Sequence, residues 1–398
     1  MQPERRLKAA MVVPVDRGGY LWLALNLCEA LAENGADMTL VTSRSCKELP
    51  AHESGFRIMA VLGGMEPERP KLLRGVSYGA TMLGLRAYLR RGGFDIVHFQ
   101  DSIVPHVDAA FFMLRGSGRP KAVLTSHDPD QDAITATRRS LLRRKALAGV
   151  YRGVDGIIVM SDSARDELVS AFDVPASKVA RIAHGNYRSY GADRAPSKAD
   201  ARQRLGLTAE GKLVLFFGSL KPSKGLECLL RAFARVREAE PTARLLVAGE
   251  PRGVEVPALE ALAESLHLGE SAILRPGYVP SEAVPDYLAA ADLVALPYLR
   301  IFQSGVLHLA YSFGRPVVAT RVGALAEDVQ DGKSGLLVPP GDEEALADAI
   351  LELLGSPERL ATIGAYATEL SQTVYDWKAI ARQTLDFYES LLVRGRAA

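Results

Sequence analysis

The chain has 398 residues, which is long for a single hydrophobic core and predicts two domains. Its composition, 48% hydrophobic and 24% charged with a formal net charge of +1, is that of an ordinary globular protein, so we expect no nucleic-acid partner. Because no apolar run approaches the roughly 18 residues of a membrane helix and the first residues lack a cleavable signal, we expect a cytoplasmic protein.

Short apolar runs alternate with helical patterns along the first half of the chain. The turn "DRGG" is followed by a predicted helix, and strands are predicted at 8–15, 37–43, 94–100, 121–127 and 156–161. Continuous β-branched runs separated by helices indicate a parallel sheet, in which ligands bind beyond the carboxyl ends of the strands. The residues at those ends are Gly18, Gly19, His98, Gln100, Ser126, His127 and Ser161.

A polar stretch rich in Gly and Pro interrupts this rhythm. We predict a linker at 188–204, between an N-terminal domain of residues 1–187 and a C-terminal domain of residues 205–372. The last segment, 373–398, predicts a helix that returns to the N-terminal domain. After the linker, strands are predicted at 212–219, 243–250, 272–278, 293–297, 316–320 and 335–340. The fold class is therefore α/β, with two Rossmann-like parallel-sheet domains.

The loop "FFGSLKPSKGLE" places small and basic residues where a strand meets a helix. Gly218 and Ser219 end the strand, Lys221 and Lys224 follow, and Gly225 enters the helix. Two lysines beside a helix start suit a diphosphate, which needs positive charges and amide donors. A solvated, charged loop is the alternative interpretation.

The stretch "FQSGVLHLAYSFGRPVV", residues 302–318, places small and polar residues before an apolar helix. Ser304 as a simple N-cap is one interpretation. The other is that Ser304, Gly305 and the amides that follow bind a phosphate. A helix start offers N–H groups without intrahelical partners and the positive end of the helix dipole.

The sequence predicts no metal site and no cofactor. In "HDPDQD", Asp128, Asp130 and Asp132 alternate as in a divalent-cation loop, but the glycine and late glutamate of an EF-hand are missing, which favours a solvated acidic loop. The three cysteines are too scattered for a zinc cluster or a disulfide framework. Neither a Rossmann dinucleotide fingerprint nor a Walker loop occurs.

The basic excess of the chain lies in its first half, where residues 1–190 hold 26 Lys+Arg against 20 Asp+Glu. It gathers in two helical stretches, with Arg74, Arg86, Arg90 and Arg91 in one and Arg138, Arg139, Arg143, Arg144, Lys145 and Arg152 in the other. An ordinary solvated helix explains the second stretch, because Leu147, Val150, Tyr151 and Val154 mark an inward face. Docking on anionic lipid, worth about 1 kcal/mol per basic side chain near the surface, is the alternative.

Five motifs of the second half occur in this order: "FFGSLKPSKG", "ARLLVAGEP", "PGYVPSEAVPDYLAAADLVALPY", "QSGVLHLAYSFGRPVVAT" and "VGALAEDVQDGKSGLLVPPGDEEALA". Together they closely resemble the nucleotide-sugar-binding domain of the family-4 retaining glycosyltransferases. That family has the GT-B fold, in which two Rossmann-like domains face a central cleft. The N-terminal half matches more loosely, through "DRGG", "TSHD", "IIVMSDSARDEL" and "IAHGNY". The resemblance covers nearly the whole chain.

The resemblance implies where the donor diphosphate binds. Lys224 matches the family's lysine on the diphosphate, and Lys221 matches the neighbouring basic position. Ser304, Gly305 and Val306 fall where the family binds the same diphosphate through amides at a helix start.

Other parts of the donor have implied positions as well. His127 matches a histidine that contacts the donor sugar near the reacting centre. Gly18 and Gly19 resemble the glycine loop that approaches the donor from the N-terminal domain, where the lack of a side chain permits close approach. Tyr278 and Val279 lie where the nucleobase packs.

Two glutamates that family members commonly carry around this helix start are replaced by Ile301 and Leu309. The first usually contacts the donor sugar and the second the ribose hydroxyls, so the sequence does not identify the sugar or the base of the donor. The chain resembles a branch that reads "QSGV…AYAFGKP" and also lacks both glutamates. Gln303 and Glu327 are candidates for the missing polar contact, although Glu327 as a carboxylate at a helix start is the alternative.

The resemblance implies a retaining glycosyltransferase that moves a sugar from a nucleoside-diphosphate sugar to a hydroxyl acceptor, without a metal, in glycan, glycolipid or polysaccharide biosynthesis. Many relatives use lipid-linked acceptors, which would agree with peripheral contact between the basic helices and the inner face of the membrane. A nucleotide-sugar epimerase of the same fold is one alternative, but it needs a carboxylate pair that we do not identify. A non-catalytic nucleotide-binding relative is the other, suggested by the missing glutamates.

Overall fold

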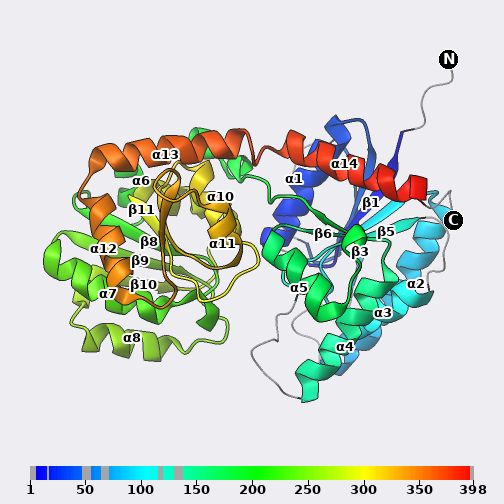
Figure 1. The fold of residues 1–398 in the computed structure, drawn as a ribbon, viewed down its shortest axis with the longest axis horizontal. Coiled ribbons are helices and arrows are strands. Elements are labelled where there is room, and N and C mark those ends of the chain that lie inside the picture. Colours follow the sequence, from blue (N-terminus) through cyan, green and yellow to red (C-terminus); the bar gives the residue numbers. More distant parts are fainter. Residues whose placement is uncertain are drawn as a thin grey trace. The chain divides into compact units, whose positions relative to one another are not determined.

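The computed structural model describes residues 6–15, 18–46, 55–63, 71–114, 120–129 and 138–394. The chain divides into two compact units, shown in Figure 1. Unit 1 comprises Met1–Gly185 and Trp377–Ala398, and unit 2 comprises Asn186–Asp376. Of the helices in the described ranges, none combines the length and the apolar character that a bilayer span requires.

Unit 1 is built on a sheet with the strand order β3-β2-β1-β4-β5-β6-β7, in which every recorded pair is parallel. The strands are β1 (Lys8–Val13), β2 (Asp37–Ser43), β3 (Arg57–Leu62), β4 (Ile96–Gln100), β5 (Lys121–Thr125), β6 (Gly156–Val159) and β7 (Val179–Arg181). Their apolar runs confirm five predicted strands. The edge strands β3 and β7 were not predicted: the apolar run at 58–62 was overlooked, and β7 is only three residues long.

Helices α1 and α14 pack against each other in unit 1, although they lie at opposite ends of the chain (Figure 1). The helices of this unit are α1 (Gly19–Glu33), α2 (Lys71–Arg91), α3 (Pro105–Leu114), α4 (Arg138–Gly153), α5 (Asp162–Phe172), the 3₁₀ turn η1 (Ala176–Lys178) and α14 (Trp377–Arg394). Ile380, Ala381, Tyr388 and Leu391 of α14 belong to the same buried cluster as Met11 of β1. The last helix is therefore part of the core of unit 1.

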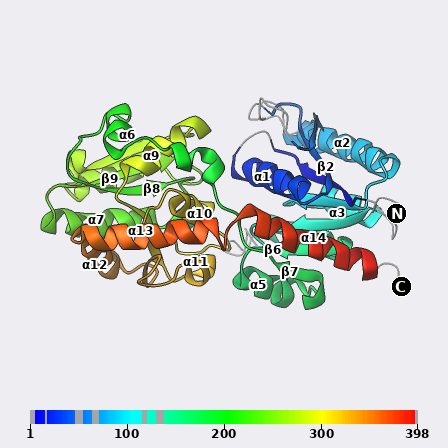
Figure 2. The same cartoon turned by 90° about the horizontal axis from the view of Figure 1, so that it is seen from above.

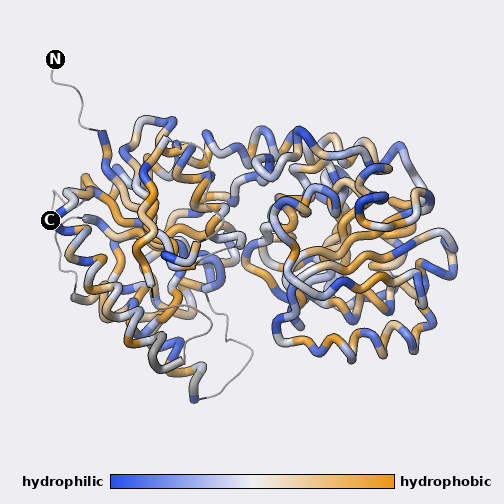
Figure 3. The backbone as a smooth tube through the Cα atoms, turned by 180° about the vertical axis from the view of Figure 1, so that it is seen from behind, coloured by the Kyte–Doolittle hydropathy of each residue, from blue (hydrophilic) through white to orange (hydrophobic). Residues whose placement is uncertain are grey.

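Unit 2 is built on a second sheet with the order β10-β9-β8-β11-β12-β13, again with every recorded pair parallel. The strands are β8 (Lys212–Phe217), β9 (Ala243–Gly249), β10 (Ala272–Pro276), β11 (Leu293–Leu296), β12 (Val317–Thr320) and β13 (Gly335–Val338). All six correspond to predicted strands. In Figure 3 the inner strands of both units are predominantly hydrophobic, as parallel strands covered on two faces require.

Helices cover both faces of the unit 2 sheet. In Figure 2, α6 and α9 lie on one face, and α7, α12 and α13 lie on the other. The helices are α6 (Lys198–Arg204), α7 (Leu226–Ala239), α8 (Val256–Ser265), α9 (Val284–Ala290), α10 (Gly305–Ser312), α11 (Gly323–Asp328), α12 (Glu343–Leu354) and α13 (Pro357–Gln372). The 3₁₀ turns are η2 (Arg188–Tyr190), η3 (Ala192–Arg194), η4 (Pro222–Lys224), η5 (Gly269–Ser271) and η6 (Ser281–Ala283).

The stretch 188–204, predicted as a linker, lies within unit 2 and holds η2, η3 and α6. Arg202 of α6 explains this placement. Its guanidinium is buried, contacts the carboxylate of Asp292 at 3.0 Å and donates to the carbonyls of Ala209 and Gly211. Because a buried guanidinium needs such partners, these bonds hold the stretch against the sheet.

Candidate active site

The carboxyl edge of the unit 2 sheet brings the ends of three strands together. The N–H of Gly218, after β8, donates to the carbonyl of Ala248 in β9, and that of Gly277, after β10, donates to the carbonyl of Gly249. Gly218 has a φ of +97°, a conformation that favours glycine. The chain therefore turns sharply at the edge where parallel sheets bind ligands.

Lys224 lies at this edge with its ammonium group against an aromatic side chain. Its Nζ atom is 3.3 Å from the Tyr298 hydroxyl and 4.8 Å from the centre of the Tyr298 ring. The Tyr298 ring is buried and follows β11 directly, so it holds the lysine stem on a rigid surface. We did not single out Tyr298 from the sequence; its signal is an aromatic residue just beyond the strand "LVALP".

At Gly225, the residue after Lys224, the loop that carries the lysine lies very close to the segment after β11. Its φ is +64°, and a Cβ atom there would lie 2.0 Å from the carbonyl oxygen of Pro297. The N–H of Leu299 also donates to the carbonyl of Ser223 at 2.8 Å. These contacts join η4 to the segment after β11.

Helix α10 begins beside the same loop. Ser304 is its N-cap, and the Ser304 hydroxyl accepts a hydrogen bond from the N–H of Leu307 at 3.3 Å, a bond that leaves the first N–H groups of the helix available to a phosphate. By helix geometry, the N–H groups of Gly305 and Val306 have no partner within the helix. A Cβ atom at Gly218 would lie 3.1 Å from Cγ2 of Val306 and 3.3 Å from Nζ of Lys224, so the helix start and the lysine converge there.

Two residues beside α10 have unusual surroundings. A Cβ atom at Gly305 would lie only 2.6 Å from the hydroxyl oxygen of Tyr187, so a side chain there must displace a buried aromatic ring. The amide oxygen Oε1 of Gln303 is buried and has no hydrogen-bond partner within the described ranges. Leaving such an acceptor unpaired costs about 1–3 kcal/mol, so Gln303 is a candidate for contact with a ligand.

The other donor-side residues also follow strands of the unit 2 sheet. Among them, Lys221 contacts Lys224, because its carbonyl accepts a hydrogen bond from the Lys224 N–H at 3.0 Å. Ser219 follows β8 and is half-buried, and Lys221 is exposed before η4. Tyr278, with 41% of its surface exposed, and the half-buried Val279 follow β10. Glu327 is half-buried as the fifth residue of α11, which follows β12, so the alternative interpretation of Glu327 as a carboxylate at a helix start is wrong.

The carboxyl edge of the unit 1 sheet holds His127 in a buried network. The imidazole stacks on the ring of Tyr20, with centroids 4.2 Å apart, and its Nε2 atom is 3.0 Å from Oε1 of Gln100. Tyr20 is the second residue of α1, which begins at Gly19 with Gly18 as its N-cap, at a φ of +90°. The predicted glycine turn and His127 therefore occur at one edge of this sheet.

Asp101 and Asp108 are two carboxyl groups of this edge that sequence reasoning missed. Asp101 follows β4 with a φ of +69°, which is rare outside glycine, and it accepts a hydrogen bond from the N–H of Ser102. Loss of solvation raises its pKa to about 7; the N–H of Ser102 and the Tyr20 hydroxyl oppose this shift, whereas the charge of Asp128 adds to it. Burial likewise raises the pKa of Asp108 to about 6.

Three histidines of unit 1 are buried in their neutral form. Burial lowers the pKa of His98 and of His127 to about 3, and that of His184 to about 4. For His127, the charges that His184 and His98 would carry lower the pKa further. An imidazole at this edge therefore acts near pH 7 as a neutral hydrogen-bonding group.

Unit 1 is expected to lose stability as the pH falls from about 6.5 to about 4. In this window the unfolded chain binds protons on three histidines that the folded chain keeps neutral. Each histidine lowers the free energy of unfolding by about 1.4 kcal/mol for every pH unit between its unfolded and folded pKa. Asp101 and Asp108 have raised pKa values and offset part of this loss, because their protonation favours the folded state. Because three histidines lower the stability and only two carboxyl groups raise it, unit 1 is expected to become less stable overall.

Tryptophan fluorescence during urea unfolding at pH 7, 6 and 5 measures this loss, because the chain's two tryptophans, Trp22 and Trp377, both lie in unit 1. The variant Asp101→Asn removes one offsetting carboxyl and should make the decrease between pH 7 and 5 steeper than in wild type. A midpoint that is constant or rises on acidification would contradict neutral burial of the histidines.

No group of three His, Cys, Asp or Glu side chains suited to a metal occurs in the described ranges. Of the acidic loop, Asp128 is described, whereas Asp130 and Asp132 lie outside the described residues. The expectation of a metal-independent protein therefore stays a prediction.

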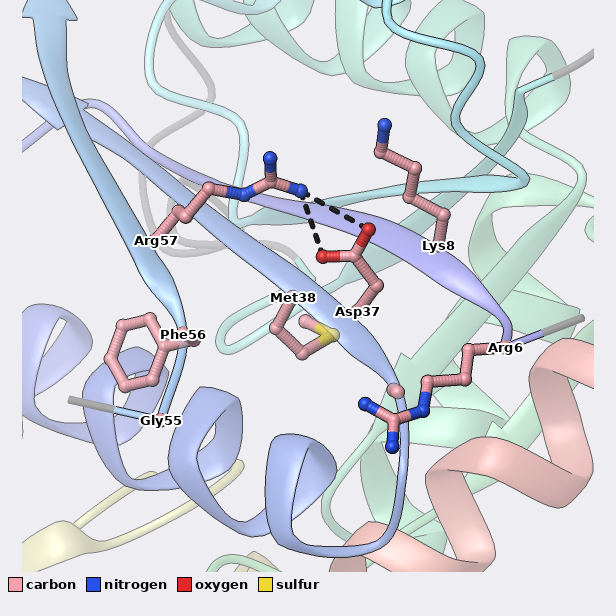
Figure 4. A pocket seen from close by; sticks show the side chains of 8 residues that line it. Arg6, Lys8, Asp37, Met38, Gly55, Phe56 and Arg57 are labelled. Atoms are coloured by element: carbon pink, nitrogen blue, oxygen red, sulfur yellow. Dashed lines mark hydrogen bonds and ion pairs between the residues drawn. The ribbon is translucent and has the colours of Figure 1, made fainter.

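A cavity of about 650 Å³ opens at the amino edge of the unit 1 sheet (Figure 4). Two of its three cations have partners: Arg57 contacts Asp37 at 2.8 Å, and Nζ of Lys8 donates to the carbonyl of Gly92 at 2.8 Å. Parallel sheets bind ligands at the carboxyl edge, so we place no substrate here. The residues that line the cavity are Arg6, Lys8, Ala36, Asp37, Met38, Gly55, Phe56 and Arg57.

Each unit matches a known protein family. Residues 17–185 match Glycosyltransferase Family 4, and residues 211–356 match Glycosyl transferases group 1. A D-inositol 3-phosphate glycosyltransferase from Nocardioides sp. is 33% identical over 397 residues, covering 94% of this chain and 85% of the relative. A protein of the same name from Corynebacterium urealyticum is 29% identical over 400 residues, covering 94% and 91%.

Solved structures agree with this result. Sucrose-phosphate synthase from Thermosynechococcus elongatus matches with a TM-score of 0.79 at 25% identity, covering 98% of this chain and 100% of that chain. HepE from Anabaena, in complex with UDP and glucose, matches with a TM-score of 0.75 at 19% identity, covering 97% and 100%, which supports the fold alone. The chain therefore belongs to the family-4, group 1 glycosyltransferases and is a sugar-transferring enzyme with the GT-B fold.

Proposed function

We propose that this chain is a retaining glycosyltransferase that binds the diphosphate of a nucleoside-diphosphate sugar at the carboxyl edge of the unit 2 sheet. The observation that carries the proposal is the convergence of Lys224 with the start of α10 around Gly218. A cation and the N–H groups of a helix start together suit a diphosphate. HepE, a structural neighbour, is solved with UDP-glucose, a donor of this class.

Neighbouring residues complete the proposed donor site. Lys221 supplies a second charge from the same loop, while Ser219 and Gly225 shape that loop. Tyr278 and Val279 pack the nucleobase; the exposed ring of Tyr278 offers an aromatic face for this contact.

Gln303 supplies the polar contact that the glutamates of the family's other members would make. Its unpaired, buried Oε1 accepts a hydrogen bond from a donor hydroxyl group. Leu309 is buried within α10, so an apolar side chain occupies the second glutamate position. Glu327 is the remaining candidate for that contact. We place the chain in the branch with "QSGV" because it carries Gln303, Ser304 and Gly305 together.

In unit 1, His127 contacts a hydroxyl group of the transferred sugar, and Gly18 and Gly19 leave room for the donor. The acceptor oxygen forms a bond to the anomeric carbon on the face from which the bond to the phosphate oxygen breaks. The acceptor proton moves to that leaving phosphate oxygen, so the configuration is retained and no side-chain nucleophile is needed. Lys224, Lys221 and the amides of α10 stabilise the negative charge that develops on the diphosphate.

The test is to incubate the protein with UDP-, GDP- and ADP-sugars and to measure released nucleoside diphosphate with and without an acceptor. D-inositol 3-phosphate is the first acceptor to try, because the relatives carry it in their names. Release stimulated by the acceptor, with an α-linked product from an α-linked donor, is expected. An isomerised nucleotide sugar would favour an epimerase, and binding without any turnover a non-catalytic relative.

Activity is expected to persist in excess EDTA, because lysines and amides supply the positive field that a metal provides in other enzymes. Rates with and without chelator should agree within about twofold. A loss that magnesium or manganese restores would contradict the proposal and return Asp128, Asp130 and Asp132 to consideration as ligands.

A lipid-linked acceptor and peripheral contact with anionic bilayers are the finer part of the proposal. Helix α4 exposes Leu141 and Leu142, at 56% and 53%, beside the exposed Arg144 and Lys145. Its Leu147, Val150 and Tyr151 are buried, as the predicted inward face requires. Exposed leucines beside cations suit an anionic bilayer better than water. On α2, Arg90 and Arg91 are exposed and Arg86 is half-buried, while the side chains of Arg74 and Arg139 lie outside the described part.

Vesicles test this surface directly. The protein should sediment with phosphatidylglycerol vesicles more than with phosphatidylcholine vesicles, and less at high salt. The double variant Leu141→Gln, Leu142→Gln should reduce binding at least several-fold. A matched control, Leu299→Gln in unit 2, which is 48% exposed, should not. Equal binding to both lipids, or none, would leave α4 as an ordinary solvated helix.

A further inference from the structure

His98 lies in the middle of β4 rather than at the carboxyl end that the sequence predicted, whereas His127 lies just beyond β5. These two buried histidines of unit 1 differ in how their ring nitrogens are paired. His98 has a partner on both sides: Nδ1 is 2.7 Å from the Tyr388 hydroxyl and Nε2 is 2.6 Å from the Thr125 hydroxyl. His127 is just as buried, but only its Nε2 atom has a partner, Oε1 of Gln100 at 3.0 Å. In the described ranges, Nδ1 of His127 is buried without one.

Gln100 determines which nitrogen of His127 carries the proton. The amide nitrogen of Gln100 donates to the sulfur of Met11 at 3.2 Å, and this orientation turns the amide oxygen toward the imidazole. The reverse orientation would set an amide oxygen against sulfur and lose that bond. Since an amide oxygen only accepts, Nε2 of His127 must be the N–H donor. A neutral imidazole has one N–H group, so Nδ1 carries a lone pair.

The lone pair of Nδ1 needs a donor that the described residues do not supply. Burying an acceptor without a hydrogen bond is unfavourable, so such atoms usually have an explanation in a ligand or a water. Tyr20 stacks on one face of the ring at 4.2 Å and blocks that direction. Because the lone pair of Nδ1 lies in the plane of the imidazole, the missing donor must approach in that plane, on the side of the ring away from Gln100.

We infer that Gln100 is a positioning residue that keeps His127 in the Nε2-protonated form and thereby makes Nδ1 the acceptor for a hydroxyl group of the sugar substrate. The inference rests on the proposed function and adds a rule of specificity. A sugar with a hydroxyl at the contacted position donates to Nδ1, whereas a deoxy sugar leaves the atom unpaired. A carboxylate there, as in a uronic acid, presents only acceptors and is excluded.

The protonation state of His127 can be measured without any substrate. In ¹⁵N-labelled wild-type protein at pH 7, NMR should show the His127 proton on Nε2 and none on Nδ1. In Gln100→Leu the preference should weaken, giving a mixture of the two forms. Gln100→Glu keeps an oxygen acceptor but adds a negative charge, so it should raise the pKa of His127 and protonate Nδ1 on mild acidification. A wild-type proton on Nδ1 would overturn the inference.

Kinetics test the specificity rule. With the nucleotide sugar that wild type turns over best, one monodeoxy analogue should lose about tenfold to a hundredfold in kcat/KM. Gln100→Leu should lose most of this discrimination while it still turns over the analogue. Equal use of every monodeoxy analogue by wild type would overturn the inference.

Thr125→Val is the matched control, because it removes the hydroxyl partner of the other buried histidine, His98. It should lower thermal stability as Gln100→Leu does, but should keep the discrimination against the analogue. Loss of discrimination in both variants would show that only core packing matters and would overturn the inference. Wild-type protein without transferase activity would contradict the proposed function, whereas the NMR result would still test the role of Gln100.

Discussion

Replacing Lys224 by methionine is expected to lower transferase turnover more than tenfold while the protein stays folded. Methionine keeps an unbranched stem on the Tyr298 ring but removes the ammonium group that lies 3.3 Å from the Tyr298 hydroxyl. Hydrogen bonds to charged groups are worth about 1.5–3 kcal/mol, which corresponds to roughly tenfold to more than a hundredfold in rate. Charge that develops on the leaving diphosphate makes kcat, rather than KM alone, the affected constant.

Two further variants separate charge from packing at Lys224. Tyr298→Phe removes the hydroxyl but keeps the ring under the lysine, so it should cost far less turnover than the loss of the ammonium group. Lys333→Met removes an exposed lysine elsewhere in unit 2 and should leave turnover within about twofold. If Lys224→Met and Lys333→Met behave alike, Lys224 does not bind the diphosphate.

Gly305→Val is expected to abolish nucleoside-diphosphate binding, measured by calorimetric titration. The added side chain would meet the Tyr187 hydroxyl and displace the start of α10, whose N–H groups are proposed to contact the phosphate oxygens. Ser304→Ala is the mild comparison. It removes only the bond from the Leu307 N–H to the Ser304 hydroxyl, so it should cost about 1 kcal/mol of stability and leave affinity nearly unchanged.

Tyr187 requires a control for the same experiment, because a Cβ atom at Gly305 would meet its hydroxyl oxygen at 2.6 Å. The double variant Gly305→Ala, Tyr187→Phe removes that oxygen and admits a methyl group with a smaller disturbance. If α10 binds the phosphate, the double variant should fold and bind the nucleoside diphosphate, whereas Gly305→Val should lose binding. Equal affinities of folded wild type and Gly305→Val would instead leave "QSGV" as a helix cap and remove the phosphate from this position.

Strands and caps were predictable where the signal is local. Buried parallel strands appear as apolar runs, and all six strands of unit 2 coincide with such runs. The cap at Ser304 was also predictable, since a hydroxyl residue before an apolar helix start has few better uses. The edge strand β3 was missed although residues 58–62 form an apolar run. Much of that run is exposed at the sheet edge, so an apolar run does not by itself report burial, which depends on neighbours.

Contacts between distant residues were not predictable. Lys224 and Tyr298 are 74 positions apart in the sequence, and His127 and Gln100 are 27 apart. Each pair meets because adjacent parallel strands end at one edge of a sheet, and no periodicity in the sequence reports which side chains face each other there. The contact between Arg202 and Asp292 was not predictable either. The polar composition around Arg202 favoured a linker, but its guanidinium is buried against Asp292.

The sequence by itself determined the alternation of strands and helices, the family motifs and the residue types at the carboxyl ends of the strands, because these follow from local order along the chain. Only the tertiary structure decided which of those residues form a site. It placed Lys224 on Tyr298 beside α10, left Oε1 of Gln303 and Nδ1 of His127 without a hydrogen-bond partner among the described residues, and paired both nitrogens of His98. The reason is that hydrogen-bond satisfaction and burial depend on the packing of several elements at once, which no single segment encodes.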